Sequence, residues 1–419
     1  MNKKMRRIVR KKILSFIGSL VIIIGVFGDR KVVAAKQTGG IMVRTFIKLL
    51  VTEMKLPLED KIESNTYIKA AYQANILQSG DFESYRKKIT RAECAMLLNR
   101  ADEYLHKDVV IKSTLIDEII EKRISDIKEI KKELRVPVAK IYAKGIMKGY
   151  SNGYGIKSRR FLGNNYVGKA STKNFIDLTL HPKKRAKIAP NGLLIRTTNL
   201  PKNAKKFSYI LDCFPNKYYD RRFYQDIYVE KDTFKEYKDY VLPVHMKNAK
   251  YKNVFYEYPM QEQMDLYGEE WIEMAETFIK CIFNVDYRTI EKNKKWRETL
   301  KANSVELNIS ADDYLDRYIE RMKKHHTIVE TSVVSTDISG CYDSCDGLCL
   351  RVYVKYRVSA TDIPKDNTEL ILSGHTYIKG LTLNEWRTDI IDVLFASENG
   401  FTGEGDSLKP LLRFLLFTK

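Results

Sequence analysis

The sequence has few cysteines, a single long apolar run and none of the short motifs that mark common enzyme classes. Six cysteines among 419 residues are too few for the dense disulfide framework of a small secreted domain. The one long apolar run lies at the N-terminus, which excludes a protein with several membrane spans. The chain also lacks Gly-x-Ser-x-Gly, His-Glu-x-x-His and phosphate-binding-loop motifs, so it carries no signature of a serine hydrolase, a metallopeptidase or a P-loop nucleotide-binding protein.

The composition is that of a chain with folded domains. Hydrophobic residues make up 44% and charged residues 30%, which excludes a disordered, collagen-like or low-complexity chain. The length is sufficient for two or three domains with cores of their own. The formal net charge is +20, but without residues 1–35 the balance is 64 basic against 52 acidic residues, or +12. Because these charges are interleaved, they predict a solvated surface with a bias towards anionic partners.

Residues 1–35 contain the three parts of an export signal in the expected order. A dense basic segment is followed by fifteen residues without a charge, residues 13–27, and then by Val33 and Ala35 at the positions of a small-residue cleavage site. We therefore predict a signal peptide that is cleaved near Ala35, and an extracellular mature protein without nucleic-acid partners. The alternative is an uncleaved membrane anchor, although a bilayer span needs roughly 20 apolar residues.

Apolar residues recur at helical spacing between residues 41 and 181. Thr90 and Glu93 have the spacing of a capping box, which predicts that a helix starts there. The order of helix, glycine-containing turn and helix occurs twice, in units at residues 45–105 and 123–180. The units lie about 60 residues apart, and such a period is typical of repeated supersecondary units.

The motif Thr90-Arg91-Ala92-Glu93 resembles the opening of the second helix in an S-layer homology repeat. Residues 65–77 resemble the first helix of the same repeat. In the second unit, residues 124–127 resemble the opening motif of the family, and residues 139–153 resemble its helix with a glycine-rich end. The sequence thus resembles exported bacterial proteins with degenerate S-layer homology repeats, with Lys169-Ala170-Ser171-Thr172 standing where a second Thr-Arg-Ala-Glu would be.

The resemblance implies helical modules that hold exported proteins non-covalently to anionic, often pyruvylated, cell-wall polysaccharide. Carried over residue by residue, it implies that Thr90, Arg91, Glu93 and Asp126 bind the wall polymer, with no catalytic residue, metal or cofactor. Arg91 has the clearest physical rationale, because a guanidinium at a helix N-terminus suits a carboxylate or phosphate. The alternative is that Arg91 only pairs with Glu93 or another nearby acid.

Residues 182–261 are rich in tyrosine interleaved with lysine and arginine, and have few clean periods. Residues 193–198 predict a strand, and the basic run at residues 183–187 predicts a hinge between domains. Tyrosines among basic residues could stack on sugar rings, but tyrosines that are half-buried against neighbouring domains are more common. We therefore predict a connecting region.

Residues 262–419 predict an α+β domain. A strong amphipathic helix at residues 269–283 is followed by further helices up to residue 325, after which the period switches from 3.6 to two. Strands are predicted at residues 327–334, 348–358, 370–381 and 389–395. This order predicts helices on one face of a curved antiparallel sheet. It resembles nuclear-transport-factor-like or cystatin-like folds, a likeness that predicts no function by itself.

Three cysteines and two adjacent histidines are the remaining candidate site residues. Cys341, Cys345 and Cys349 have spacings that do not match the paired Cys-x-x-Cys of zinc sites. In an exported protein, a disulfide with Cys341 and Cys349 as candidates is the more expected outcome, and reduced thiols are the alternative. His325 and His326 end a predicted helix, where adjacent residues point to different faces, so a catalytic or metal-binding pair is not expected.

Taken together, the patterns predict an exported protein at the cell wall that displays a C-terminal binding domain. Its expected partner is a secondary cell-wall polysaccharide or a peptidoglycan-linked polymer, and no Leu-Pro-x-Thr-Gly signal indicates covalent attachment. One alternative is an extracellular enzyme that acts on wall polymer or glycan through a C-terminal cleft. Another is a membrane-tethered accessory protein of a secretion or spore-coat assembly, and a membrane partner is expected only if the signal segment is uncleaved.

Overall fold

The computed structural model describes residues 39–59, 63, 65–222, 242–243, 260–307, 309–344, 347–363, 381–398 and 408–416. The chain divides into two compact units, residues 1–38 and 39–419, and all described residues belong to the second. The predicted signal peptide and all but the last residue of the predicted strand at residues 370–381 therefore lie outside the described residues. Within the described part, no helix has both the length and the apolarity that a membrane span requires.

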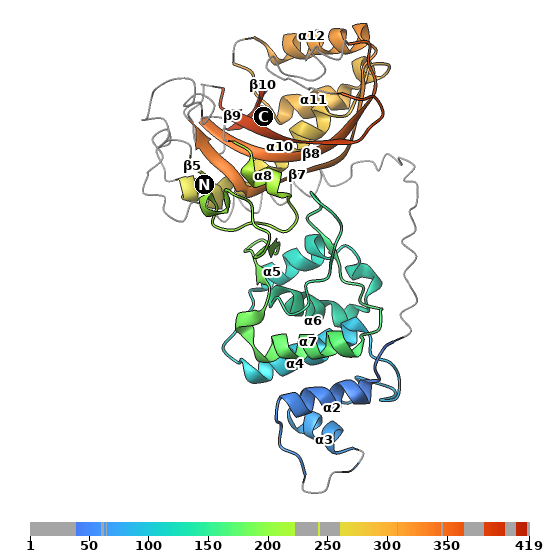
Figure 1. Ribbon diagram of the computed structural model, residues 1–419. Coiled ribbons are helices and arrows are strands. Elements are labelled where there is room, and N and C mark those ends of the chain that lie inside the picture. The colour runs from blue at the N-terminus through green and yellow to red at the C-terminus, as the bar shows by residue number, and fades with distance from the viewer. Residues whose placement is uncertain are drawn as a thin grey trace, which may run out of the picture. The chain divides into compact units, whose positions relative to one another are not determined.

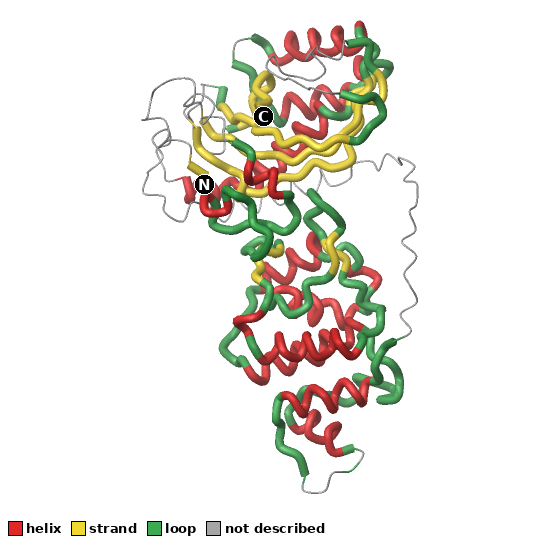
Figure 2. The backbone as a smooth tube through the Cα atoms, viewed as in Figure 1, coloured by secondary structure: helices red, strands yellow, loops and turns green. Residues whose placement is uncertain are grey.

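Helices form the first described part. They are α2 (Val43–Glu53), α3 (Thr66–Gln73), α4 (Arg91–Leu105), α5 (Ser113–Glu118), α6 (Lys132–Ala143) and α7 (Lys169–Leu180), with a π-helical turn at Ile119–Arg123, a 3-10 turn at Ile127–Glu129, and two short strands, β1 (Tyr150–Ser151) and β2 (Arg159–Arg160). Their apolar faces share one buried core, as the helical spacing predicts. Figure 2 shows helices joined by loops in this part, with the long strands confined to the C-terminal part.

The helix α4 begins where the capping box predicts. The hydroxyl of Thr90 accepts a hydrogen bond from the backbone N–H of Glu93, and the Glu93 carboxylate accepts one from the backbone N–H of Thr90 at 2.9 Å. Two of the backbone donors at this helix end are thereby satisfied.

Three helices begin at a closed ring of backbone hydrogen bonds, although the sequence predicts only two repeat units. Ile41 precedes α2, Ile89 precedes α4, and Val167 precedes α7. Ile41 donates to Val167 at 3.0 Å, Val167 donates to Ile89 at 3.1 Å, and Ile89 donates to Ile41 at 3.0 Å. Because every member of the ring donates once and accepts once, α2, α4 and α7 occupy equivalent positions. The predicted first unit, residues 45–105, contains most of α2, and this helix has no Thr-Arg-Ala-Glu motif.

The turns after α3 and α6 have the same geometry. Asn75 and Gly145 occupy the first position of the two turns, with φ angles of 56° and 69°. The next residue donates to a carbonyl five positions back in both cases, from Ile76 at 3.0 Å and from Ile146 at 3.1 Å. Glycine adopts a positive φ without strain and asparagine is the residue that tolerates it next best, so two different residues build the same turn.

The connecting region packs on the C-terminal sheet. Its elements are the 3-10 turn η3 (Pro182–Lys184), strands β3 (Lys187–Ile188) and β4 (Leu194–Ile195), the 3-10 turn η4 (Ala204–Lys206) and helix α8 (Asn216–Asp220). Buried residues from this region, including Leu211, Phe214 and Tyr218, share a core with Tyr342 and Leu394 of the sheet. The predicted boundary at residue 262 therefore divides a continuous core.

A six-stranded antiparallel sheet forms the C-terminal part. Its strands are β5 (Leu242–Pro243), β6 (Val285–Asp286), β7 (Ile328–Ser344), β8 (Gly347–Ala360), β9 (Arg387–Ala396) and β10 (Lys409–Leu416), in the order β10-β9-β8-β7-β5 with β6 paired to β7. Its helices are α10 (Met260–Ile282), α11 (Lys294–Ala302) and α12 (Ala311–Lys324), with a 3-10 turn at Ile290–Lys292. In Figure 1 the strands curl around α10 and α11. Helices before strands agree with the predicted α+β class.

Both faces of this sheet are buried. One face packs with Trp271, Phe278 and Ile282 of α10 in a core of buried apolar residues. The other face is covered by the connecting region. This double burial explains why β8 is buried along most of its length rather than at alternate positions.

A buried ion pair joins the connecting region to the sheet. Arg351 of β8 and Asp392 of β9, exposed by 1% and 0%, meet through two bonds of 2.7 and 2.9 Å. The Arg351 guanidinium also donates to the carbonyl oxygens of Tyr218, Arg221 and Arg222 at 3.2, 3.0 and 3.0 Å. Because these donors all have partners, the pair is a structural contact between α8 and the sheet.

The expected disulfide between Cys341 and Cys349 is not formed. The register pairs Cys341 with Leu350 and Cys349 with Tyr342, so the two side chains point to opposite faces of the sheet. Cys341 belongs to the core around α10, and Cys349 belongs to the core under the connecting region. The hairpin geometry thus separates two thiols that lie close in sequence, and Cys345 lies outside the described residues.

Candidate functional site

Arg91 occupies the first position of α4 and is buried, with 7% of its surface exposed. Its Nε donates to the carbonyl oxygen of Phe161 at 2.9 Å. The guanidinium carbon lies 5.1, 5.2 and 5.5 Å from the ring centroids of Tyr150, Phe161 and Phe175. Burial lowers the pKa of Arg91, but an arginine side chain remains a cation in proteins. The three rings stabilise that charge and fix the direction of the guanidinium.

Arg91 does not pair with Glu93. The Glu93 carboxylate is occupied by the backbone and hydroxyl of Thr90 and by Lys87, whose Nζ lies 2.8 Å away. Burial opposes ionisation of Glu93, but the hydrogen bonds from Lys87 and Thr90 outweigh it and hold the pKa of this carboxyl below its usual value. Thr90 and Glu93, both expected to bind ligand, thus serve to build the helix end that carries Arg91.

Asp126, the fourth expected ligand residue, has a positioning contact instead. It is buried, with 5% of its surface exposed, and its two carboxylate oxygens accept hydrogen bonds from the backbone N–H groups of Phe161 and Leu162, both at 2.7 Å. Leu162 has a positive φ of 56°. Asp126 therefore holds the bend whose carbonyl oxygen at Phe161 in turn orients Arg91.

Arg91 lines a cavity of about 420 Å³, a volume within the usual range for small-molecule sites. Its wall includes Tyr150 and the glycine-rich turn at Gly145 and Gly149. A Cβ atom on Gly145 would lie 1.9 Å from the carbonyl oxygen of Ala186, and φ is 69° there. Only glycine allows the turn and the segment around Ala186 to approach this closely.

The charged side chains that line the cavity are mostly cationic: Arg91, Lys148, Lys184, Arg185 and Arg196, with Asp212 as the one carboxylate among them. Three of these residues are neutralised by neighbours. Lys184 lies 2.9 Å from Asp177, Asp212 lies 2.7 Å from Arg159, and Arg185 pairs with Asp102.

Arg91, Lys148 and Arg196 have no carboxylate partner in the part of the chain that the structure describes. The cavity therefore presents three uncompensated positive charges, which favours an anionic ligand.

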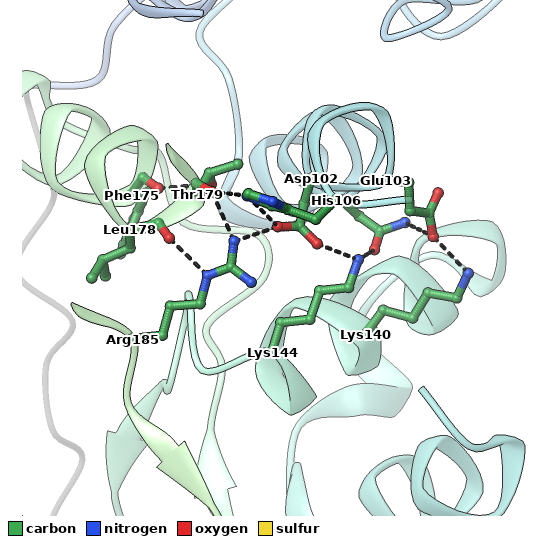
Figure 3. Close-up of polar contacts among 10 residues, drawn as sticks. Asp102, Glu103, His106, Lys140, Lys144, Phe175, Leu178, Thr179 and Arg185 are labelled. Carbon is green, nitrogen blue, oxygen red and sulfur yellow. Dashed lines mark hydrogen bonds and ion pairs between the residues drawn. The ribbon is translucent and has the colours of Figure 1, made fainter. Parts of the chain in front are cut away.

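Buried charges at the far end of α4 hold this wall in place. Asp102, with no exposed surface, pairs with Arg185 and with Lys144 at 2.8 Å (Figure 3). Arg185 also donates to the carbonyl oxygens of Leu178 and Thr179 at 2.8 and 2.7 Å. Asp102 thus connects α4 to the end of α6 through Lys144, and to the segment after α7 through Arg185. These ion pairs hold Arg185 in its place in the cavity wall.

Sequence reasoning missed Lys148, Arg185 and Arg196. Lys148 lies between the two glycines of a turn that was assigned only a structural role. Arg185 lies in the basic run that was predicted to be a hinge, and Arg196 follows β4 in a region without a motif. No local sequence pattern distinguishes these three residues from basic residues at the surface, because the cavity forms only when distant segments of the chain come together.

Among the described residues, none from the C-terminal sheet or its helices lines the cavity around Arg91. His326 and Asp362 lie 2.5 Å apart, but their side chains are 58% and 64% exposed, and neither lines the cavity around Arg91. Among the described residues, no group of histidine, cysteine, aspartate and glutamate side chains is arranged to hold a metal ion.

Comparison with protein families gives one match. The model of the S-layer homology domain matches residues 123–158. This segment is an S-layer homology domain. It contains Asp126, α6 and the glycine-rich turn at Gly145 and Gly149, which are the features that hold and face Arg91. The S-layer homology segment thus supplies one wall of the cavity, whereas Arg91 and Arg196 lie outside the matched residues. No curated protein matches the chain.

Proposed function

We propose that the protein is exported and attaches non-covalently to an anionic cell-wall polysaccharide through the cavity around Arg91, and that it displays its C-terminal domain as a binding module. S-layer homology domains in general anchor proteins to cell-wall polymers, which places this chain in association with the cell surface. The observation that carries the proposal is the buried Arg91 guanidinium in a cavity whose unpaired charges are all positive.

The cavity offers suitable chemistry for an acidic sugar. A guanidinium can bind both oxygens of a carboxylate or phosphate. Tyr150, which is 47% exposed and lies beside Arg91, presents an aromatic ring to a sugar. Because the ring contacts already fix Arg91, little side-chain entropy is lost when the ligand binds.

The interior of the C-terminal domain favours a binding module over the enzyme alternative. The space between α10 and the curled sheet is occupied by a continuous apolar core that includes Trp271, Phe283 and Tyr356. An enzyme of this architecture needs a cleft with converging polar groups. A filled core leaves the outer surface of the domain for contacts with partners.

Cosedimentation with purified cell walls tests the attachment. We expect Arg91→Gln to weaken binding by roughly 1.5–3 kcal/mol, the contribution of a hydrogen bond to a charged group. Arg86→Gln is the matched control, because Arg86 is exposed, precedes the same helix and does not line the cavity. Equal sedimentation of parent and Arg91→Gln at moderate salt would contradict the assignment of the site.

Export is tested separately. We expect the secreted protein to begin at or near Lys36, because Val33 and Ala35 fit the cleavage positions. N-terminal sequencing of the extracellular protein measures this. Recovery of the full-length chain in the membrane fraction alone would support the anchored alternative.

A further inference from the structure

The cavity around Arg91 has a second wall that the S-layer homology segment does not supply. This wall comes from Lys184, Arg185, residues 194–198 and Asp212, all of which lie beyond residues 123–158, the range of the family match. The backbone of the wall is fixed, because Arg196 donates its N–H to Ile210 at 2.7 Å next to the β3–β4 hairpin.

Arg196 has a side chain with unmet hydrogen-bonding capacity. Its Nε and Nη2 atoms are buried and have no hydrogen-bond partner among the described residues. Buried polar groups nearly always have hydrogen-bond partners, and a buried donor of a charged group that has no partner lowers the stability of the protein. A guanidinium that lines a cavity and has unpaired donors therefore has the capacity to bind an acceptor that a ligand supplies.

The other cations of this wall are paired with carboxylates. Arg185 pairs with Asp102 and donates to two carbonyl oxygens, and Lys184 is paired with Asp177. Arg196 and Arg91 are thus the two guanidinium groups of the cavity lining without a carboxylate partner among the described residues, and they come from distant segments of the chain.

We propose that Arg196 is a second anion-binding residue of this cavity, and that the ligand is an acidic sugar unit bound between Arg91 and Arg196. This inference rests on the proposed attachment to wall polysaccharide. The anionic oxygens belong to a carboxylate or a phosphate, which guanidinium groups bind in the same way. The hydroxyl-bearing Thr197 and Thr198 lie at the same wall and suit the sugar hydroxyls. The connecting region is therefore part of the recognition site.

Fluorescence anisotropy of labelled acidic polysaccharide, released from the walls of the producing cells, tests the inference on the full-length protein. We expect Arg196→Gln to weaken binding about ten-fold to a hundred-fold and Arg196→Lys to have a smaller effect, since lysine keeps the charge. Lys187→Gln is the matched control, because Lys187 is exposed on the same hairpin and does not line the cavity. Polymer amidated with carbodiimide distinguishes the sources of charge, since this treatment removes carboxylate charge and leaves phosphate.

The outcomes separate this inference from the proposed function. Weak binding by both Arg91→Gln and Arg196→Gln, with parental thermal unfolding, supports a site between two arginines. Parental affinity of Arg196→Gln, together with weak binding by Arg91→Gln, would overturn the role of Arg196 and leave the wall attachment in place. A parent protein that does not bind the polymer would overturn both. If Arg196→Gln unfolds early, the same comparison is made with Arg196→Lys, whose parental affinity would also overturn the inference.

Discussion

Helices α4 and α7 begin at the same ring of backbone hydrogen bonds but differ in what their first residues do. Their N-cap residues, Thr90 and Gly168, have nearly identical backbone angles, with φ of −82° in both and ψ of 163° and 164°. Thr90 caps its helix with a side chain and precedes the buried Arg91, whereas Gly168 has no side-chain cap and precedes the exposed Lys169. The backbone ring therefore positions a helix start without the motif.

This difference shows that the helices can take up these positions without the Thr-Arg-Ala-Glu motif. The ring needs only backbone groups, so α2 and α7 keep their places although their first residues are Val43 and Lys169. The Thr-Arg-Ala-Glu residues add two things to α4, a capped end and a guanidinium in a cavity. Degenerate repeats can thus support the architecture, while the Thr-Arg-Ala-Glu motif adds the helix cap and the buried guanidinium.

The largest expected change in stability comes from substitutions in the last turns of α4 and α7. Asp102 of α4 is fully buried with Lys144 and Arg185, whereas Asp177 of α7 is exposed beside Lys184. We expect Asp102→Asn to destabilise the protein by about 3–5 kcal/mol, because it leaves two buried cations without their carboxylate. Asp177→Asn is the matched control and should leave stability unchanged. Urea unfolding measures both, and equal effects would show that Asp102 is not the structural tie we describe.

A smaller effect is expected at the helix start. Thr90→Ala removes the acceptor for the N–H of Glu93 and should destabilise α4 by about 1 kcal/mol, a typical value for a lost N-cap. Thr90→Ser keeps the acceptor and should restore most of that loss. Thermal unfolding of the three proteins checks this expectation. If serine does not restore stability, the methyl group of Thr90 rather than its hydroxyl is what stabilises the helix.

The acid dependence of α4 should follow from Glu93. Its pKa in the folded protein lies below the ordinary value of 4.5, so ionised Glu93 stabilises the fold above that pH, and the contribution is lost as the pH falls through the lowered pKa. We expect the stability difference between the parent and Glu93→Gln to be present at neutral pH and to shrink below about pH 4.5. Unfolding curves at several pH values measure it, and a difference that is constant with pH would rule out the charge as its cause.

The sequence predicted the elements with strong local signals. The capping box at Thr90 and Glu93, the amphipathic face of α10 and the strands β8 and β9 all appear in the structure. Local sequence signals did not predict the secondary structure where contacts between distant residues determine it. Between α10 and α11, where the sequence predicts only helices, the chain forms β6 and a 3-10 turn, because Val285 pairs with Val329 in the sheet.

The residues of the candidate site show the same limit of prediction from local sequence signals. Arg91 could be found from its motif, because helix capping is local. Asp126 was assigned to the ligand, but its carboxylate meets backbone groups at Phe161 and Leu162, a contact that no spacing in the sequence reveals. Arg196 reaches the cavity only through the fold of the connecting region. The boundary at residue 262 stays a prediction, although the core beneath α8 makes us expect that residues 262–419 alone would aggregate.

The smallest and most direct test of the comparison gives α7 the cap that it lacks. A Cβ atom added at Gly168 has the carbonyl oxygen of Gly39 as its nearest neighbour, at 3.7 Å, so a side chain fits there without strain. Because the backbone angles match those of Thr90, the hydroxyl in Gly168→Ser should accept from the N–H of Ser171 and stabilise the protein by about 0.3 kcal/mol. Gly168→Ala is the control, since alanine restricts the unfolded chain in the same way but offers no acceptor. If thermal unfolding shows equal gains for serine and alanine, the effect comes from the unfolded chain, and α7 does not use its N-cap position as α4 does.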